Sequence, residues 1–543
     1  MGQHRRRYGG MSDAVVFVTQ QSAVLTVPTG ASEESLSRRV HKSALWSAAS
    51  TLILKLANIA IMAVVARTLT PHDFGVFAVA LTVHTVVSSV AELGLTACLM
   101  RGDIDPDELA PTVAMMSLLS SLALATVMVL FARPIAAALG SASAAGPLRV
   151  MALAVLLVGV FAVPTAELLR EFRQDRQFIA TIVGFIPSNV LLIVLATGGS
   201  GAMSFAWSRV LGQLLTGLAI TCMVPRWYWP RFARRHVRFL LSFGIPLAGA
   251  NLLNFILLNA DYALVGRLMG AVELGIYMLA FNIASWSTSL LSAMINGIAM
   301  PAFSRIKHDS HRLQRGLSRS TQAIALIALP ICSLTLTLAH PLVVTVYGSR
   351  WDAAAPVLAI LALYGALSVF CLLIANVLSG MGHTVGLFVV QVAWLAALVP
   401  LMNVGVRYDG IVGAAYAHIV VVILVAVPAY LIMLKRASSV RLLPLVSAVA
   451  PALIGSVVCG VASYGATTLV GSMAGQLLLG GAVGGVAYLM LTLPTLLPLA
   501  RTVLRLPPSV LRAAERYCAL LSRYVPVYQS APTRTHGRHR AIS

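Results

Sequence analysis

The chain has 543 residues, of which 58% are hydrophobic and 10% charged, with a mean hydropathy of +0.87 and a formal net charge of +21. Soluble domains carry roughly 25% charged residues, so this composition excludes a soluble fold. The apolar residues form continuous runs of about 20, which suits helices crossing the membrane, whereas a membrane β-barrel would alternate apolar and polar positions. The sequence predicts an all-α polytopic membrane protein.

The N-terminal segment 1–42 is polar and basic and lacks a signal-peptide core, so we expect a flexible cytoplasmic tail. Fourteen apolar runs follow, and each predicts one membrane helix. They span 43–66, 74–100, 109–131, 148–168, 178–197, 202–224, 237–265, 274–300, 318–345, 353–377, 386–404, 411–434, 442–468 and 477–499.

The basic residues are distributed unevenly between the two sides of the membrane. With the N-terminus in the cytoplasm, 31 of the 39 Lys and Arg fall on the inner side, six on the outer side and two within spans. This asymmetry predicts that both termini lie in the cytoplasm. The positive charge therefore reflects topology and contact with anionic membrane lipids, and we expect no nucleic-acid partner.

The first span carries a polar face. Ser47, Thr51, Lys55 and Asn58 are spaced by four, four and three residues, so they share one side of a helix. An ammonium near mid-span is costly in lipid, so this face must meet water or protein. Lys55 and Asn58 are candidates for binding a phosphate or diphosphate. The alternative is a structural ion pair between Lys55 and an acid on a neighbouring helix.

A short turn after the first span recurs after the seventh. Residues 67–81 align without gaps with 267–281, and an even number of spans separates the copies, so both turns face the outer side. The sequence predicts two parallel six-helix lobes. The matched residues predict a hinge, with a cation at one helix end, an acid at the next start and a glycine for close approach. They are Arg67, Asp73, Gly75, Arg267, Glu273 and Gly275.

Two further ionisable residues lie in the first lobe. Glu92, near the inner end of span 2, shares a helix face with His84 and Ser88, and we expect an architectural role with proton coupling as the alternative. Arg209, toward the outer end of span 6, either reaches the cavity and a phosphate or anchors the helix at the membrane surface.

Spans 7 and 8 carry polar faces of their own. Asn251, Asn254 and Asp261 share a face of span 7, and Asp261 is either a proton or sodium site for coupling or a fixed salt-bridge partner. Span 8 has a long polar stripe whose hydroxyls and amides suit sugar hydroxyls or helix contacts, and we expect it to line a cavity. The stripe consists of Asn282, Ser285, Ser289, Ser292 and Asn296.

The chain divides into six predicted segments, with a basic cytoplasmic linker between the lobes and a glycine-rich helix pair after them. The small residues of that pair allow close helix packing or a lipid-facing groove. The segments are the tail 1–42, the N-lobe 43–224, the linker 225–236, the C-lobe 237–434, the appended spans 435–499 and a basic cytoplasmic tail 500–543.

Motifs for catalysis are missing. The six cysteines lack metal-ligand spacing, and the chain has no Walker A sequence, HExxH motif or nucleophile–base arrangement. We therefore expect a protein that is not an enzyme, with no metal and no cofactor, although coupling to protons or sodium ions is compatible with the charged spans.

Several stretches, in this order and spacing, carry a family resemblance. They are 66–75, Glu92-Leu-Gly-Leu95, Arg101-Gly-Asp-Ile-Asp105, Leu168-Leu-Arg-Glu-Phe-Arg173, Phe243-Gly-Ile-Pro246 and Gly380-Met-Gly382. Across roughly residues 40–440 the chain resembles the Wzx-like polysaccharide flippases of the multidrug/oligosaccharidyl-lipid/polysaccharide exporter superfamily. The resemblance implies two six-helix lobes around a central cavity, often with two extra helices.

The resemblance also implies a function. Such a flippase lies in the bacterial cytoplasmic (inner) membrane and moves a polyprenyl-diphosphate-linked oligosaccharide to the outer leaflet by alternating access, for cell-surface polysaccharide or lipopolysaccharide biosynthesis. Its partners are that substrate, membrane lipids and polysaccharide polymerases or glycosyltransferases. The alternatives are a lipid II flippase or a cation-coupled drug exporter of the same superfamily, and an integral-membrane glycosyltransferase or polymerase. The short outer loops argue against the last of these.

Overall fold

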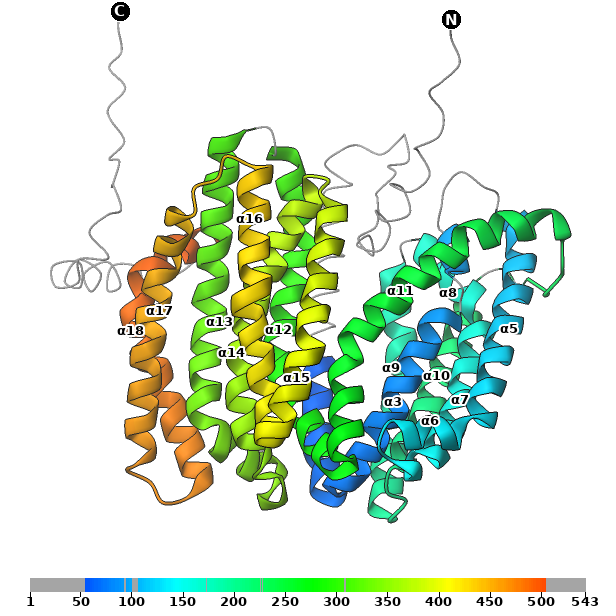
Figure 1. The fold of residues 1–543 in the computed structure, drawn as a ribbon, viewed down its shortest axis with the longest axis horizontal. Helices are drawn as coiled ribbons and strands as arrows, with labels where there is room; N and C mark the ends of the chain where they lie inside the picture. The colour runs from blue at the N-terminus through cyan, green and yellow to red at the C-terminus, as the bar shows by residue number, and fades with distance from the viewer. Residues whose placement is uncertain are drawn as a thin grey trace, which may run out of the picture.

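The computed structural model describes residues 54–91, 94–99, 106–171, 173–224, 226, 228–306 and 309–503. Within these residues every regular element is helical (Figure 1), and ten helices are long and apolar enough to cross a membrane. The predicted all-α polytopic fold is confirmed.

The helices follow the order of the predicted spans, except that span 4 is divided at Phe161 into two helices, and residues 43–53 of span 1 lie outside the described residues. Residues 54–68 are helical, and we call them the first helix. In the N-terminal half they are followed by α3 (Pro71–Ala91), α4 (Leu95–Leu99), α5 (Pro106–Leu130), α6 (Ala132–Ala138), η1 (Ala142–Ala144), α7 (Ala145–Val160), α8 (Ala162–Arg170), α9 (Gln174–Thr197) and α10 (Met203–Met223). The C-terminal half contains α11 (Arg234–Met269), α12 (Ala271–Ile306), α13 (Ser310–Tyr347), η2 (Ser349–Trp351), α14 (Ala354–Gly380), α15 (Thr384–Val421), η3 (Val422–Ala426), α16 (Val427–Ala437), α17 (Leu443–Thr467) and α18 (Met473–Val503).

Helix α15 contains the turn between predicted spans 11 and 12. Asp409 and Gly410 have non-helical backbone angles, and the φ of 56° at Gly410 lies in the left-handed region that glycine adopts without steric cost. On either side, Gly405 and Gly413 approach so closely that a Cβ on one would overlap the carbonyl group of the other. The two arms of α15 therefore run back against each other at this turn.

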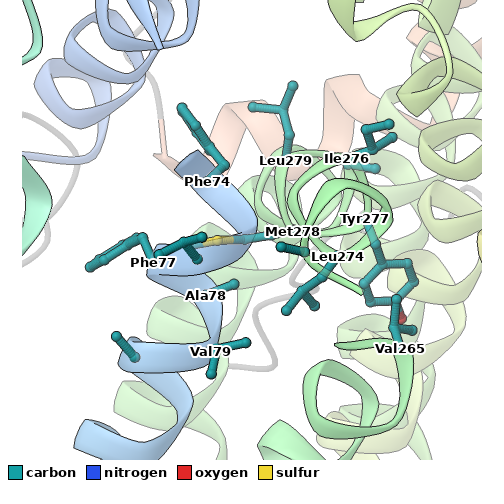
Figure 2. Packing of buried hydrophobic residues seen from close by; sticks show 14 of the residues in the cluster. Phe74, Phe77, Ala78, Val79, Val265, Leu274, Ile276, Tyr277, Met278 and Leu279 are labelled. Atoms are coloured by element: carbon teal, nitrogen blue, oxygen red, sulfur yellow. The ribbon is translucent and has the colours of Figure 1, made fainter. Parts of the chain in front are cut away.

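The two repeated turns meet where the two halves of the molecule join. A Cβ on Gly75 would overlap the carbonyl oxygen of Ala271, and a Cβ on Gly275 would overlap that of Pro71. The N-terminal ends of α3 and α12 therefore touch backbone to backbone, and we call this contact the glycine seam. Figure 2 shows Ala78 and Val79 of α3 beside α12 in the same buried cluster.

Burial changes along these two helices. The side chains from Phe74 to Ala80 on α3 and from Leu274 to Ala280 on α12 are buried. Those at 85–90 on α3 and the described ones at 285–292 on α12, apart from buried Leu291, are only partly buried. The two halves are thus in close contact at the glycine seam, and they are less tightly packed toward the C-terminal parts of α3 and α12.

Each half places its first long helix against the other half. The Trp351 indole Nε1 donates to the Ala66 carbonyl at 2.8 Å, and Arg67 donates to the carbonyls of Val346 at 3.0 Å and Thr345 at 2.5 Å. These bonds tie the first helix to the end of α13. In return, α11 lies beside α3 and the N-terminal half in Figure 1, and its Leu240 is buried in the cluster that contains Leu95 and Leu109. The linker 225–236 separates the halves in sequence, but the first helices cross between them in space.

The linker is fastened to the start of α5. Arg226 pairs with Asp107 at 2.5 Å, Arg235 pairs with Glu108 at 2.5 Å, and the Tyr228 hydroxyl also donates to Asp107. The hydrogen bond to Asp107 raises the pKa of Arg226, while burial and the same carboxylate raise the pKa of Tyr228 to about 12. Tyr228 therefore keeps its proton and remains a donor at physiological pH.

The appended pair, α17 and α18, packs closely against α13. A Cβ on Gly484 would lie 2.9 Å from the Cys459 carbonyl oxygen, and the Tyr488 hydroxyl donates to the Leu326 carbonyl at 2.8 Å. Small residues here serve close helix packing, the first of the two predicted alternatives, although a Cβ on Gly485 would meet open space.

Candidate substrate-binding cavity

A cavity of about 440 Å³ lies where the first helix, α12 and α14 come together. The first helix contributes one cation, Lys55, and the two other helices contribute mostly hydroxyls. The remaining lining residues are Phe281, Ala284, Ser285, Thr288, Ser289, Ser292, Leu361, Tyr364, Gly365 and Ser368.

The serine hydroxyls of the cavity are held by their own helices. Ser285 donates to Asn282 at 2.8 Å, Ser289 to Ser285 at 2.7 Å, and Ser368 to Tyr364 at 2.8 Å, in each case to a backbone carbonyl. A hydroxyl that donates its proton to a backbone carbonyl still has lone pairs that can accept hydrogen bonds. The wall therefore offers acceptors to a ligand rich in hydroxyl groups, and the ammonium of Lys55 offers donors to an anion.

Lys55 has no acidic partner in the part of the chain that the structure describes. No carboxylate there lies within 4.0 Å of its ammonium, and the cavity lining contains no acid. The ammonium is half-buried, so it remains available to a ligand. Glu92, the acid predicted near the inner end of span 2, lies outside the described residues.

The cavity unites three predicted binding residues and leaves the others elsewhere. Lys55, Ser285 and Ser289 line it, as does Ser292 of the same predicted stripe, whereas Asn282 is half-buried and donates to its own helix at Met278, 3.0 Å away. Asn58 and Arg209 are exposed and lie outside the lining. Asn251 and Asn254 on α11 are half-buried and outside the lining, and the side chain of Asn296 is outside the described set.

Sequence reasoning missed the contribution of α14. Tyr364 and Ser368 stand one turn apart on a largely apolar helix, with Gly365 between them. Their spacing of four was the available signal, but two hydroxyls in such a run also fit a helix-packing role.

Asp261, the predicted coupling residue, is buried away from the cavity lining. Its carboxylate lies 3.9 Å from the His418 Nε2 and 3.4 Å from the Tyr277 hydroxyl, which itself lies 3.1 Å from the same nitrogen. His418 on α15 was not singled out in the sequence, because one histidine in an apolar span is ordinarily a core residue.

The predicted hinge residues surround the glycine seam. Thr70 and Asp73 form a capping box at the start of α3: Asp73 accepts from the Thr70 amide at 3.0 Å and hydroxyl at 2.6 Å, and its own amide donates to Thr70 at 3.2 Å. Arg67 caps the end of α13 rather than its own helix. Arg267 is exposed and Glu273 half-buried at the rim of the seam.

These features define a class: a polytopic membrane protein of two helical halves that meet at the glycine seam, with a cavity between the first helix, α12 and α14 that carries a cation. Residues 64–356 match the model of the family described as polysaccharide biosynthesis protein, and the chain belongs to that family. The resemblance found in the sequence is thereby confirmed.

Individual relatives agree with this assignment. The chain is 28% identical to the succinoglycan biosynthesis transport protein ExoT of Rhizobium meliloti (strain 1021), over 86% of this chain and 95% of the relative. It is 22% identical to the lipopolysaccharide biosynthesis protein WzxC of Escherichia coli (strain K12), over 74% and 82% of the two chains. Its fold is similar to the lipid II flippase MurJ in an inward closed conformation, with a TM-score of 0.69 at 15% identity over 84% of this chain and 99% of that one.

Proposed function

We propose that this protein is a flippase that moves a polyprenyl-diphosphate-linked oligosaccharide across the cytoplasmic membrane for cell-surface polysaccharide biosynthesis. The observation that carries the proposal is the cavity, which combines hydroxyl groups with Lys55, a cation that has no acidic partner among the described residues. Family membership and the transport relative support it. Polysaccharide polymerases or glycosyltransferases would be its functional partners.

The mechanism is alternating access between two sides. The glycine seam closes one end, and the inner halves of α3 and α12 are only partly buried at the other. With both termini in the cytoplasm, this state admits substrate from the inner leaflet. Lys55 would neutralise part of the diphosphate, the hydroxyl wall would meet the sugars, and the polyprenyl chain would remain in lipid. Arg209 remains a candidate for a second phosphate contact in another state.

Lys55→Ala tests the anion site. We expect flipping of a labelled undecaprenyl-diphosphate oligosaccharide in proteoliposomes to fall about tenfold or more, because a charge-assisted hydrogen bond contributes about 1.5–3 kcal/mol. Lys55→Arg should retain most of the rate, and Lys435→Ala, an exposed cation outside this cavity, should be neutral. An unchanged rate in Lys55→Ala would refute the anion-site assignment.

The same liposomes separate the competing functions. Exchange of lipid II in preference to the polysaccharide precursor would favour a lipid II flippase. Transfer of sugar without any exchange of the labelled lipid between leaflets would contradict the transporter proposal and favour a glycosyltransferase or polymerase. In cells, deletion should leave complete oligosaccharide-lipid on the cytoplasmic leaflet.

A further inference from the structure

Three helices of the C-terminal half converge on a buried polar cluster. Asp261 comes from α11, Tyr277 from α12 and His418 from α15, and their exposed fractions are 3%, 0% and 3%. The Tyr277 hydroxyl lies between the other two, 3.4 Å from the carboxylate and 3.1 Å from the imidazole nitrogen. The cluster therefore ties α11, α12 and α15 together.

The charges around this cluster do not balance without a proton. The ion-pair partner of Asp261 among the described residues is His418, and the other ionisable side chains beside it are Tyr262 on α11 and Tyr364 on α14. Helix α3, which packs on α11, supplies no ion-pair partner in the part that the structure describes. The Asp261 carboxylate also accepts from the Tyr262 amide at 2.9 Å, but a neutral donor does not cancel a buried charge, so one proton shared by Asp261 and His418 is needed to make the cluster neutral.

A proton suits this cluster better than a sodium ion. Hard metal cations take several oxygen ligands, and here a carboxylate and a single hydroxyl face an imidazole. In addition, the Nδ1 atom of His418 is buried and has no hydrogen-bond partner among the described residues. The imidazole therefore has a spare site for proton exchange once water reaches it.

The cluster adjoins both the seam and the cavity. Tyr277 is two residues beyond Gly275 of the seam. Tyr364 and Phe281 line the cavity, and their rings lie 4.7 Å and 6.1 Å from that of His418. Helix α11, which carries Asp261, packs on α3 as well as on α12, so separation of α3 from α12 at the seam acts directly on the cluster.

We propose that Asp261, Tyr277 and His418 form the binding site of one exchangeable proton, and that this proton holds the glycine seam closed. Opening of the seam exposes the cluster to water, which takes the proton and leaves the Asp261 carboxylate solvated; reclosing takes a proton back. The inference rests on the proposed function only in assigning the seam as the gate of transport. The direction of the pH dependence follows from this proposal. The closed seam holds one more proton than the open seam, so raising the pH favours the open seam.

The test measures the distance between the inner ends of the two halves without any substrate. Spin labels replace exposed Glu171 and Arg436 in a protein otherwise free of cysteine. In the wild-type background we expect the long distance at low pH and a shift to a shorter one between about pH 5.5 and 8.5, at constant sodium concentration. Asp261→Asn, which is neutral at every pH, should keep the long distance throughout.

Two further variants keep the inference testable where Asp261→Asn fails to fold. Tyr277→Phe places at 277 the residue found at the matching position 77 of the first copy. This variant and His418→Gln should each move the midpoint of the pH-dependent distance change by about one pH unit or more. His340→Gln is the matched control: its imidazole lies 3.0 Å from Asp352 in an exposed pair, and its loss should leave the midpoint unchanged.

Three results would overturn the proton site: a distance between the labels that does not change with pH, a distance that changes with sodium concentration instead, or a pH response that persists in Asp261→Asn. None of these depends on the flipping assay. Normal flipping with no pH response would reject the proton site alone, whereas an intact pH response without flipping would reject the proposed function alone.

Discussion

At the scale of single residues, helical periodicity predicted the chemistry of the cavity better than its full outline. Lys55, Ser285 and Ser289 were found because polar residues repeat at helical spacing in apolar spans. His418 has no polar residue three or four positions away on its helix, so periodicity says nothing about it, and the pair Tyr364 and Ser368 fits a helix-packing role equally well. Only the packing of α14 and α15 against their neighbours reveals what they touch.

A residue-level prediction concerns Trp351. This side chain is fully buried, packs edge-to-face on Phe74 at 4.7 Å, and donates its indole N–H to Ala66. Trp351→Ala should destabilise the protein by about 3–5 kcal/mol, since it leaves a large cavity and an unsatisfied carbonyl. Thermal unfolding in detergent measures this, and Trp229→Ala, at a side chain 78% exposed, is the control. Equal midpoints for the two variants would contradict the role given to Trp351.

At the scale of helices, the repeat in the sequence predicted that the two turns face the same side, and the structure brings them into contact. The match of 67–81 with 267–281 placed a glycine at the same position in both copies, and these glycines are the two that meet in the seam. The exchange of the first helix and α11 between the halves was beyond sequence reasoning. An apolar run specifies the length of a membrane helix and leaves its neighbour undefined, because every neighbour is equally apolar.

An element-level prediction concerns the seam. Gly275→Ala puts a methyl group where the Pro71 carbonyl lies, so α3 and α12 must separate. In this variant, a cysteine at Ala78, which is 0% exposed, should react with a water-soluble maleimide about tenfold faster than in the parent, because the rate reports local opening. Gly249→Ala on α11, where a Cβ meets nothing within 4 Å, is the matched control. Unchanged reactivity at Ala78→Cys would show that the seam tolerates the methyl group.

At the scale of the whole molecule, the orientation in the membrane remains a prediction from charge. The turn at Asp409–Gly410 should lie outside the cell, and the connection between α16 and α17 should lie inside. Tyr408→Cys and Leu443→Cys, at side chains 88% and 79% exposed, should therefore label differently in intact cells with an impermeant maleimide. The first should react directly and the second only after permeabilisation, and the reverse pattern would invert the topology.

The exchange of first helices also constrains how the protein is made. The carbonyl of Ala66 receives its hydrogen bond from a tryptophan 285 residues further along the chain. At a synthesis rate of about 5–20 residues per second, the first helix waits in the bilayer for roughly 15–60 s before that tryptophan exists. During this interval its polar Lys55 face has no cavity to meet, so the nascent chain needs shielding from lipid, by the insertion machinery or by other helices of the N-terminal half, until the second half arrives.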